Sequence, residues 1–195
     1  YKTVCDDFGM TGNYHEFAFG PARDARGNLY VGLNLASSGA SIRPELRGEF
    51  PHYGLSREGF KASSYGRASG RMYAATPYRG WVLKITPEGE MKPFAPGFRS
   101  PNGVGFDLDG RLFVTDNQGD WCNASKLSHI SRGDFHGHPY SLHSAADPRS
   151  PLKNVRAAPD RLFTRDVPTK VPSFKLPSVW FPFQKAGRGP SGMVW

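Results

Sequence analysis

The sequence predicts an all-β fold, and three observations support this. Its 195 residues include 23 glycines and 17 prolines spread along the chain, which disfavours long helices. Residues 104–114 place the pair Asp109-Gly110 between two apolar runs, and Asp-Gly between β-formers is a strong hairpin signal. Residues 24–34 repeat the pattern of residues 107–117. Repeated hairpins of this kind are typical of a β-propeller, whose blades are four-stranded sheets arranged around an axis.

The repeat aligns without a gap. The identical positions are Asp24 with Asp107, Gly27 with Gly110, Leu29 with Leu112, Val31 with Val114, and Asn34 with Asn117. The offset is 117 − 34 = 83 positions, about twice the ~40–50 residues of a propeller blade. We therefore expect a further blade between the two copies, with strands at residues 70–76 and 81–86.

The remaining strands follow in chain order. Residues 91–95 come after the turn at 87–90, and residues 125–130 are expected to close the blade of the central hairpin. Residues 179–183 fit an edge strand, because proline cannot donate a ladder hydrogen bond in a central one. Residues 190–195 resemble the start of another blade. The sequence thus predicts one propeller domain over residues 1–195, with about four blades of a larger, incomplete ring.

Two segments break this pattern. Residues 37–69 are rich in Gly, Ser and Arg without alternation, and we expect a long loop insertion over one face. A functional loop and a merely decorative insertion are equally open there. Residues 141–172 are basic, proline-broken and weakly patterned, which predicts an irregular surface excursion.

Composition excludes several classes. The net charge of +8 comes from 25 basic and 17 acidic residues. The basic residues are scattered and form no run of Lys and Arg, which disfavours nucleic-acid binding. A basic surface would suit an anionic cofactor or an acidic polysaccharide. The sequence contains no apolar stretch of about eighteen residues, so it predicts no membrane span. Cys5 and Cys122 lack metal-ligand spacing, and both a disulfide and two unpaired thiols are open.

Residues 99–103, 116–120, 126–127 and 133–139 together resemble the glucose/sorbosone dehydrogenase family of soluble quinoproteins with a six-bladed propeller. The likeness is closest to the propeller domains of large exported bacterial dehydrogenase-like proteins. It implies a sugar (aldose) dehydrogenase that transfers hydride to pyrroloquinoline quinone (PQQ) with the help of Ca²⁺. It also implies a periplasmic or secreted protein, with a sugar or oligosaccharide as substrate and a partner such as a cytochrome as electron acceptor.

The resemblance also implies roles for individual residues. His15 would be the catalytic base that takes the proton of the sugar hydroxyl, and Asn34 falls where the family has a carboxylate that orients this base. Arg99 would contact the anionic quinone, because a guanidinium suits its carboxylates and carbonyls. The other implied contacts are Asn102, Asn117 and Lys126 for the cofactor, and Gln118, Gly119 and Asp120 for Ca²⁺. For Asn117 and Asp120, a role in holding the loop is the alternative.

This sequence departs from the family in three respects. The segment after His15 lacks a Gly-Gly element, Asn34 replaces a carboxylate, and Ser100 replaces an asparagine. An amide can fix a histidine tautomer but cannot stabilise an imidazolium as a carboxylate does. These departures weaken the inferred activity more than the inferred fold.

Two other functions are open. Residues 101–104 with 109–116 also resemble lactonase-type propellers, in which the asparagine of Pro-Asn-Gly, here Asn102, is a metal ligand for hydrolysis. A non-catalytic propeller that binds carbohydrate or serves in assembly is the third reading, because a fold does not establish activity. His136, His138 and His143 form a cluster on a loop, which is weak support for a metal site.

Overall fold

The computed structural model describes residues 1–37, 72–74, 76–119, 121–152, 154–156 and 162–194. The strands are β1 (Ala18–Arg23), β2 (Leu29–Leu33), β3 (Ala36–Ser37), β4 (Met72–Tyr73), β5 (Trp81–Ile85), β6 (Met91–Pro96), β7 (Pro101–Phe106), β8 (Leu112–Asp116), β9 (Ser125–His129) and β10 (Val179–Phe181). Two short 3-10 helices, η1 (Pro139–Ser144) and η2 (Thr164–Thr169), complete the described secondary structure. Neither is long and apolar enough to cross a membrane, and the described residues hold no other helix.

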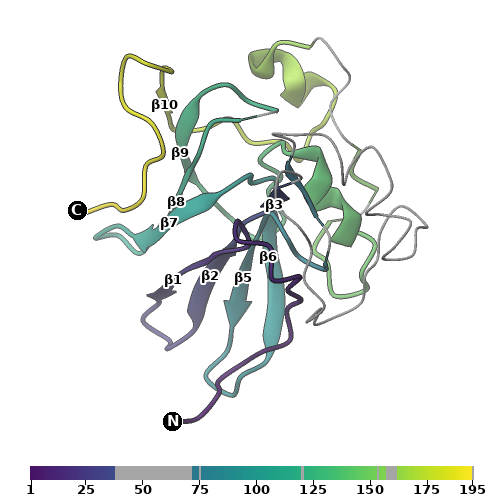
Figure 1. Ribbon diagram of the computed structural model, residues 1–195, viewed down its shortest axis with the longest axis vertical. Helices are drawn as coiled ribbons and strands as arrows, with labels where there is room; N and C mark the ends of the chain where they lie inside the picture. The colour runs from purple at the N-terminus through teal and green to yellow at the C-terminus, as the bar shows by residue number, and fades with distance from the viewer. Residues whose placement is uncertain (38–71, 75, 120, 153, 157–161, 195) are drawn as a thin grey trace.

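The all-β prediction is confirmed. Two four-stranded antiparallel sheets dominate the chain, one with the order β1-β2-β5-β6 and the other with the order β7-β8-β9-β10 (Figure 1). Each is a simple up-and-down sheet of the kind that forms a propeller blade. The edge strands β1 and β7 lie against each other where the two sheets meet. We call the sheets blade 1 and blade 2.

The repeat found in the sequence matches the two blades. Strands β1 and β2 of blade 1 correspond to β7 and β8 of blade 2 at the same offset of 101 − 18 = 83 positions. The hairpin turns are also alike, because the N–H of Gly27 bonds to the carbonyl of Asp24 as the N–H of Gly110 bonds to that of Asp107. The Asp109-Gly110 signal therefore predicted the hairpin of blade 2 correctly, and the repeat predicted the hairpin of blade 1.

The prediction of a separate blade between the copies is wrong. Strand β5 pairs with β2 along its whole length, from Leu29 opposite Ile85 to Leu33 opposite Trp81, so it is the third strand of blade 1. The short strand β4 pairs with β3 instead. The offset of 83 therefore spans one blade plus the residues inserted between β2 and β5, and the described residues form two blades rather than four. Residues 190–194, expected to start another blade, contain no strand.

The two blades share a core. Its buried members come from both sheets and from the connections next to them: Tyr30, Val82, Ala95, Phe98, Leu112, Val114 and Ile130. Gly32 allows the close approach of β2 to β7, because a Cβ there would lie 2.9 Å from Pro101. This tight packing fixes how the corresponding strand ends of blades 1 and 2 lie relative to each other.

The structure describes most of one of the two segments that were expected to be irregular. The predicted loop at 37–69 lies outside the described residues, except for Ser37 in β3. The segment 141–172 holds part of η1 and all of η2, and its Val167 and Val171 are buried against Phe135 and Phe174. Cys5 and Cys122 are both free thiols.

Candidate functional site

Asn34 and Asn117, the residues after β2 and β8, occupy equivalent positions at one end of the two blades. The N–H of Asn34 donates to the carbonyl of Phe17 (3.0 Å), and the N–H of Asn117 donates to the carbonyl of Ser100 (3.3 Å). Phe17 and Ser100 are themselves related by the repeat, since 100 − 17 = 83. The two hairpins therefore present the same polar residue in the same backbone setting.

Arg99 joins this end of the blades. Its carbonyl accepts a hydrogen bond from the N–H of Leu35 in blade 1 (3.1 Å), and its own N–H donates to the carboxylate of Asp116 in blade 2 (3.1 Å). The backbone of Arg99 is thus tied to both blades. Its Nη1 also lies 3.5 Å from Ser100 Oγ.

His15 lies in the electric field of Arg99. Burial lowers the pKa of the His15 imidazole, and the positive charge of Arg99 lowers this pKa further. The backbone N–H of His15 donates to Asn13 Oδ1 (3.0 Å), which fixes the start of the turn. We call His15, Asn34, Arg99 and Asn117 the rim cluster.

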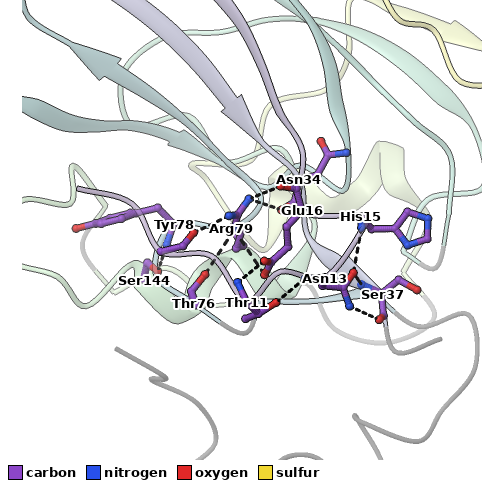
Figure 2. A network of polar contacts seen from close by, with 11 residues as sticks. Thr11, Asn13, His15, Glu16, Asn34, Ser37, Thr76, Tyr78, Arg79 and Ser144 are labelled. Atoms are coloured by element: carbon purple, nitrogen blue, oxygen red, sulfur yellow. Dashed lines mark hydrogen bonds and ion pairs between the residues drawn. The ribbon is translucent and has the colours of Figure 1, made fainter. Parts of the chain in front are cut away.

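A buried ion pair holds the segment that carries His15, as Figure 2 shows. Arg79 Nε lies 3.7 Å from Glu16 Oε1, and both side chains are almost fully buried. Arg79 also donates to the carbonyl of Gly9 (2.6 Å), and Glu16 Oε2 accepts the N–H of Thr11 (2.6 Å). Sequence reasoning missed this pair, because nothing local links Glu16 to a residue so distant in the chain.

The same guanidinium reaches the rim cluster. Arg79 Nη1 lies 3.4 Å from the carbonyl oxygen of Asn34 and 3.3 Å from that of Glu16. One buried cation therefore connects the segment of His15 to the end of β2. Breaking a buried ion pair by removing one partner costs about 3–5 kcal/mol, so the position of His15 depends on Arg79.

Three side-chain atoms of the rim cluster are buried without a hydrogen-bond partner: His15 Nδ1, Asn34 Oδ1 and Asn117 Oδ1. Most buried polar atoms in proteins are bonded, so unfilled acceptors indicate a place for a donor from a ligand or a water molecule. Among the described residues, Asn34 Oδ1 and His15 Nδ1 do not bond to each other, and the role of Asn34 in orienting His15 stays a prediction.

Lys126, an implied cofactor contact, forms a buried ion pair with Asp116. Its Nζ lies 2.7 Å from Asp116 Oδ2, and both side chains are at most 3% exposed. Asp116 Oδ1 also accepts the N–H of Ser100 (2.7 Å). Lys126 therefore neutralises the carboxylate that holds the backbone at Arg99 and Ser100, and acts on the rim cluster indirectly.

Of the predicted calcium ligands, the structure describes Gln118 and Gly119. Gln118 Oε1 accepts a hydrogen bond from Ser125 Oγ and lies 3.4 Å from the N–H of Gly189. The Arg99 side chain packs against Gly119, where an added Cβ would clash with Arg99 Nε. A guanidinium so close disfavours a divalent cation. Asp120 lies outside the described residues.

No group of three or more His, Cys, Asp or Glu side chains in the described parts of the chain could hold a metal ion. Within the predicted histidine cluster, His136 is buried and stacks on Phe98 with 4.8 Å between ring centroids, and His143 stacks on Tyr140. Asn102 lies within β7 and is half-buried.

Comparisons with known proteins add a distant likeness. No protein-family model matches the chain, and no curated protein matches it in sequence. The PQQ-bound aldose sugar dehydrogenase of Streptomyces coelicolor is similar in structure, with a TM-score of 0.47 and 18% sequence identity. The match covers 92% of this chain and 40% of that enzyme's chain. This protein therefore spans less than half of the enzyme's length. The cofactor and activity are that enzyme's own, and for this chain they are proposals.

Proposed function

We propose that this protein is a quinoprotein-like sugar dehydrogenase, and that its rim cluster binds PQQ or a closely related anionic quinone next to a sugar hydroxyl. The observation that carries the proposal is the pairing of Arg99 with His15 at the end of two matching hairpins. Arg99 supplies a fixed positive charge for an anionic ring. The lowered pKa of His15 keeps its imidazole neutral near pH 7, which is the form that accepts a proton.

The residues present fit such a ligand. Carboxylates of the cofactor would bind the Arg99 guanidinium through charge-assisted hydrogen bonds. The unfilled Oδ1 atoms of Asn34 and Asn117 would accept hydrogen bonds from the N–H of the quinone or from sugar hydroxyls. We propose no metal at Gln118 and Gly119, because Arg99 already brings a positive charge there.

The chemistry divides between the ligand and the chain. A bound quinone of this type supplies an acceptor for the hydride of a sugar C–H bond. His15 accepts the proton of the hydroxyl on the same carbon, so that the C–O bond becomes a carbonyl as the C–H and O–H bonds break. Arg79 and Glu16 hold the His15 segment in place, and the Asp116–Lys126 pair holds the backbone of Arg99.

Dye-linked oxidation of a panel of aldoses tests the proposal. With added PQQ, with and without Ca²⁺, the protein is expected to reduce the dye. His15→Gln should lower kcat by about 10²–10⁴-fold, as expected for loss of a general base. The matched control is His129→Gln, since His129 is an exposed histidine at the end of β9, and it should leave the rate unchanged.

Other outcomes would redirect the assignment. Lactone hydrolysis that does not depend on quinone would support a lactonase. Binding of glycans with neither activity would support a non-catalytic module. Dye reduction that is equal in wild type and His15→Gln would contradict the role of His15.

A further inference from the structure

A cleft lies at the opposite end of the blades from the rim cluster. Its volume is about 330 Å³, and the side chains that matter in it are Arg23, Asp24, Arg26, Tyr30, Lys84 and Phe106. The turn between β1 and β2 forms one wall, whereas Asn34 follows the other end of β2. A strand rises about 3.3 Å per residue, so the six residues of β1 separate the two sites by roughly 20 Å.

The Asp24 carboxylate in this cleft already accepts hydrogen bonds at both oxygens. Asp24 Oδ1 accepts the backbone N–H groups of Arg26 and Asn28, both at 2.9 Å. Asp24 Oδ2 accepts Asn28 Nδ2 (2.7 Å) and the hydroxyl of Tyr30 (3.3 Å). Four donors therefore satisfy the carboxylate from within the turn and β2. In consequence Asp24 stabilises the turn rather than forming an ion pair with a neighbouring arginine.

Within the described parts of the chain, three cations around the cleft have no carboxylate partner. Among the described residues, no ion pair includes Arg23, Arg26 or Lys84. The cleft is therefore positively charged and open to an anion. Its cations come from the end of β1, from the turn that follows and from β5, so the packing of the blade holds them together.

The matching turn of blade 2 shows that this charge is not a general property of the hairpin. There Arg111 pairs with Asp107 (2.6 Å) and with Asp109 (2.7 Å), so its charge is neutralised locally. The repeat places Arg26 where blade 2 has Asp109, since 109 − 26 = 83. The turn of blade 2 thus neutralises its arginine by internal ion pairs. Within the described residues, the turn of blade 1 exposes cations without ion pairs to the cleft.

The cleft also has an aromatic wall. The rings of Tyr30 and Phe106 pack edge to face with 5.3 Å between centroids, and Phe106 is only partly buried. A volume of about 330 Å³ is at the lower end of small-molecule pockets and suits one ring. A partly exposed aromatic ring beside polar groups is the usual surface for the apolar face of a sugar.

We propose that this cleft binds an acidic sugar unit, a pyranose that carries a carboxylate, with the anion held by Arg23, Arg26 and Lys84 and the ring against Phe106. The ligand class follows from the combination of unpaired cations and an aromatic wall. A simple oxyanion would use only the first feature, and a neutral sugar only the second. The proposal does not depend on PQQ or on the rim cluster.

Calorimetric titration with trigalacturonate, maltotriose and inorganic phosphate tests this proposal, together with amide NMR shifts that locate the site. Trigalacturonate is expected to bind, to shift amides at residues 23–28, and to weaken at high salt. The double variant Arg23→Gln/Arg26→Gln should weaken its binding by about tenfold or more. The matched control Arg132→Gln/Arg165→Gln removes the same charge from exposed positions outside the cleft and should bind as the wild type does, with thermal melts showing that all variants fold.

Three results would overturn the proposal. Equal binding of maltotriose would show that charge is not recognised, and equal binding of phosphate would show that the sugar ring is not. An equal loss in the control variant would show that only the net charge of +8 attracts the ligand. Because none of these measurements uses quinone or dye reduction, they can fail independently of the proposed dehydrogenase.

Discussion

The charge of Arg99 lowers the pKa of the His15 imidazole, although the two residues belong to segments that precede different blades. Backbone hydrogen bonds from Leu35 to Arg99 and from Asn34 to Phe17 bring these segments to one end of the molecule. This relationship ties the candidate base to the candidate anion-binding residue, and it can be tested without any ligand.

Removing the charge of Arg99 should raise the pKa of His15. In Arg99→Gln the repulsion between the guanidinium and a protonated imidazole is gone, while burial still lowers the pKa. An NMR titration of the His15 ring signals in wild type and variant measures the change. Arg132→Gln, which removes an exposed cation after β9, should leave the titration unchanged. An unaltered His15 pKa in Arg99→Gln would contradict the electrostatic effect of Arg99 on His15.

His136 should make the protein less stable in acid. The pKa of its imidazole is lowered to about 3, chiefly by burial and then by the charge of Lys126, which Asp116 opposes; Lys175 and His129 add smaller repulsion. Between pH 6.5 and 3 the unfolded chain binds a proton that the folded protein does not, so stability falls as the pH falls through this window. The expected loss is about 1.4 kcal/mol per pH unit below 6.5.

Chemical unfolding at pH 7 and pH 4.5 measures this contribution. His136→Phe keeps a ring stacked on Phe98 and removes the titrating group, so its stability should depend less on pH than that of the wild type. The quantity to compare is the change in unfolding free energy between pH 7 and pH 4.5 within each protein, because the substitution also changes the absolute stability. An identical pH dependence in both proteins would contradict it.

The Asp116–Lys126 pair should be far more important than a surface ion pair. Lys126→Met leaves a fully buried carboxylate without its counter-charge, which typically costs about 3–5 kcal/mol of unfolding free energy. Lys92→Met removes the partner of Glu90 on the surface, where both side chains are largely exposed, and should cost under about 1 kcal/mol. Urea unfolding of the two variants provides the comparison, and equal losses would contradict the structural role of Lys126.

Asn34 and Asn117, whose buried Oδ1 atoms accept no hydrogen bond from the described residues, should be more important for ligand binding than for stability. Asn117→Leu removes a buried acceptor that has no partner, so the free energy of unfolding should stay level or rise. Quinone or sugar binding should weaken, because the acceptor for the ligand is lost. Thermal melts and ligand titrations of the same preparations test both parts. A destabilised variant with normal binding would assign Asn117 a purely structural role.

The sequence predicted the local features well and the long-range ones poorly. The Asp109-Gly110 turn identifies the hairpin of blade 2, because turn chemistry is local, and the gapless repeat extends the prediction to blade 1. The blade count was wrong, because a repeat distance cannot distinguish two blades from one blade with an insertion between β2 and β5. The Glu16–Arg79 and Asp116–Lys126 pairs depend on how distant segments and neighbouring strands meet, so no spacing in the sequence indicates them.

Titration of the protein with PQQ tests the central claim most directly. The account predicts saturable binding to the wild type, about 10–100-fold weaker binding to Arg99→Gln from loss of a charge-assisted hydrogen bond, and unchanged binding to Arg132→Gln. Binding that is equally strong in Arg99→Gln would contradict the account, as would failure of the wild type to bind PQQ at all.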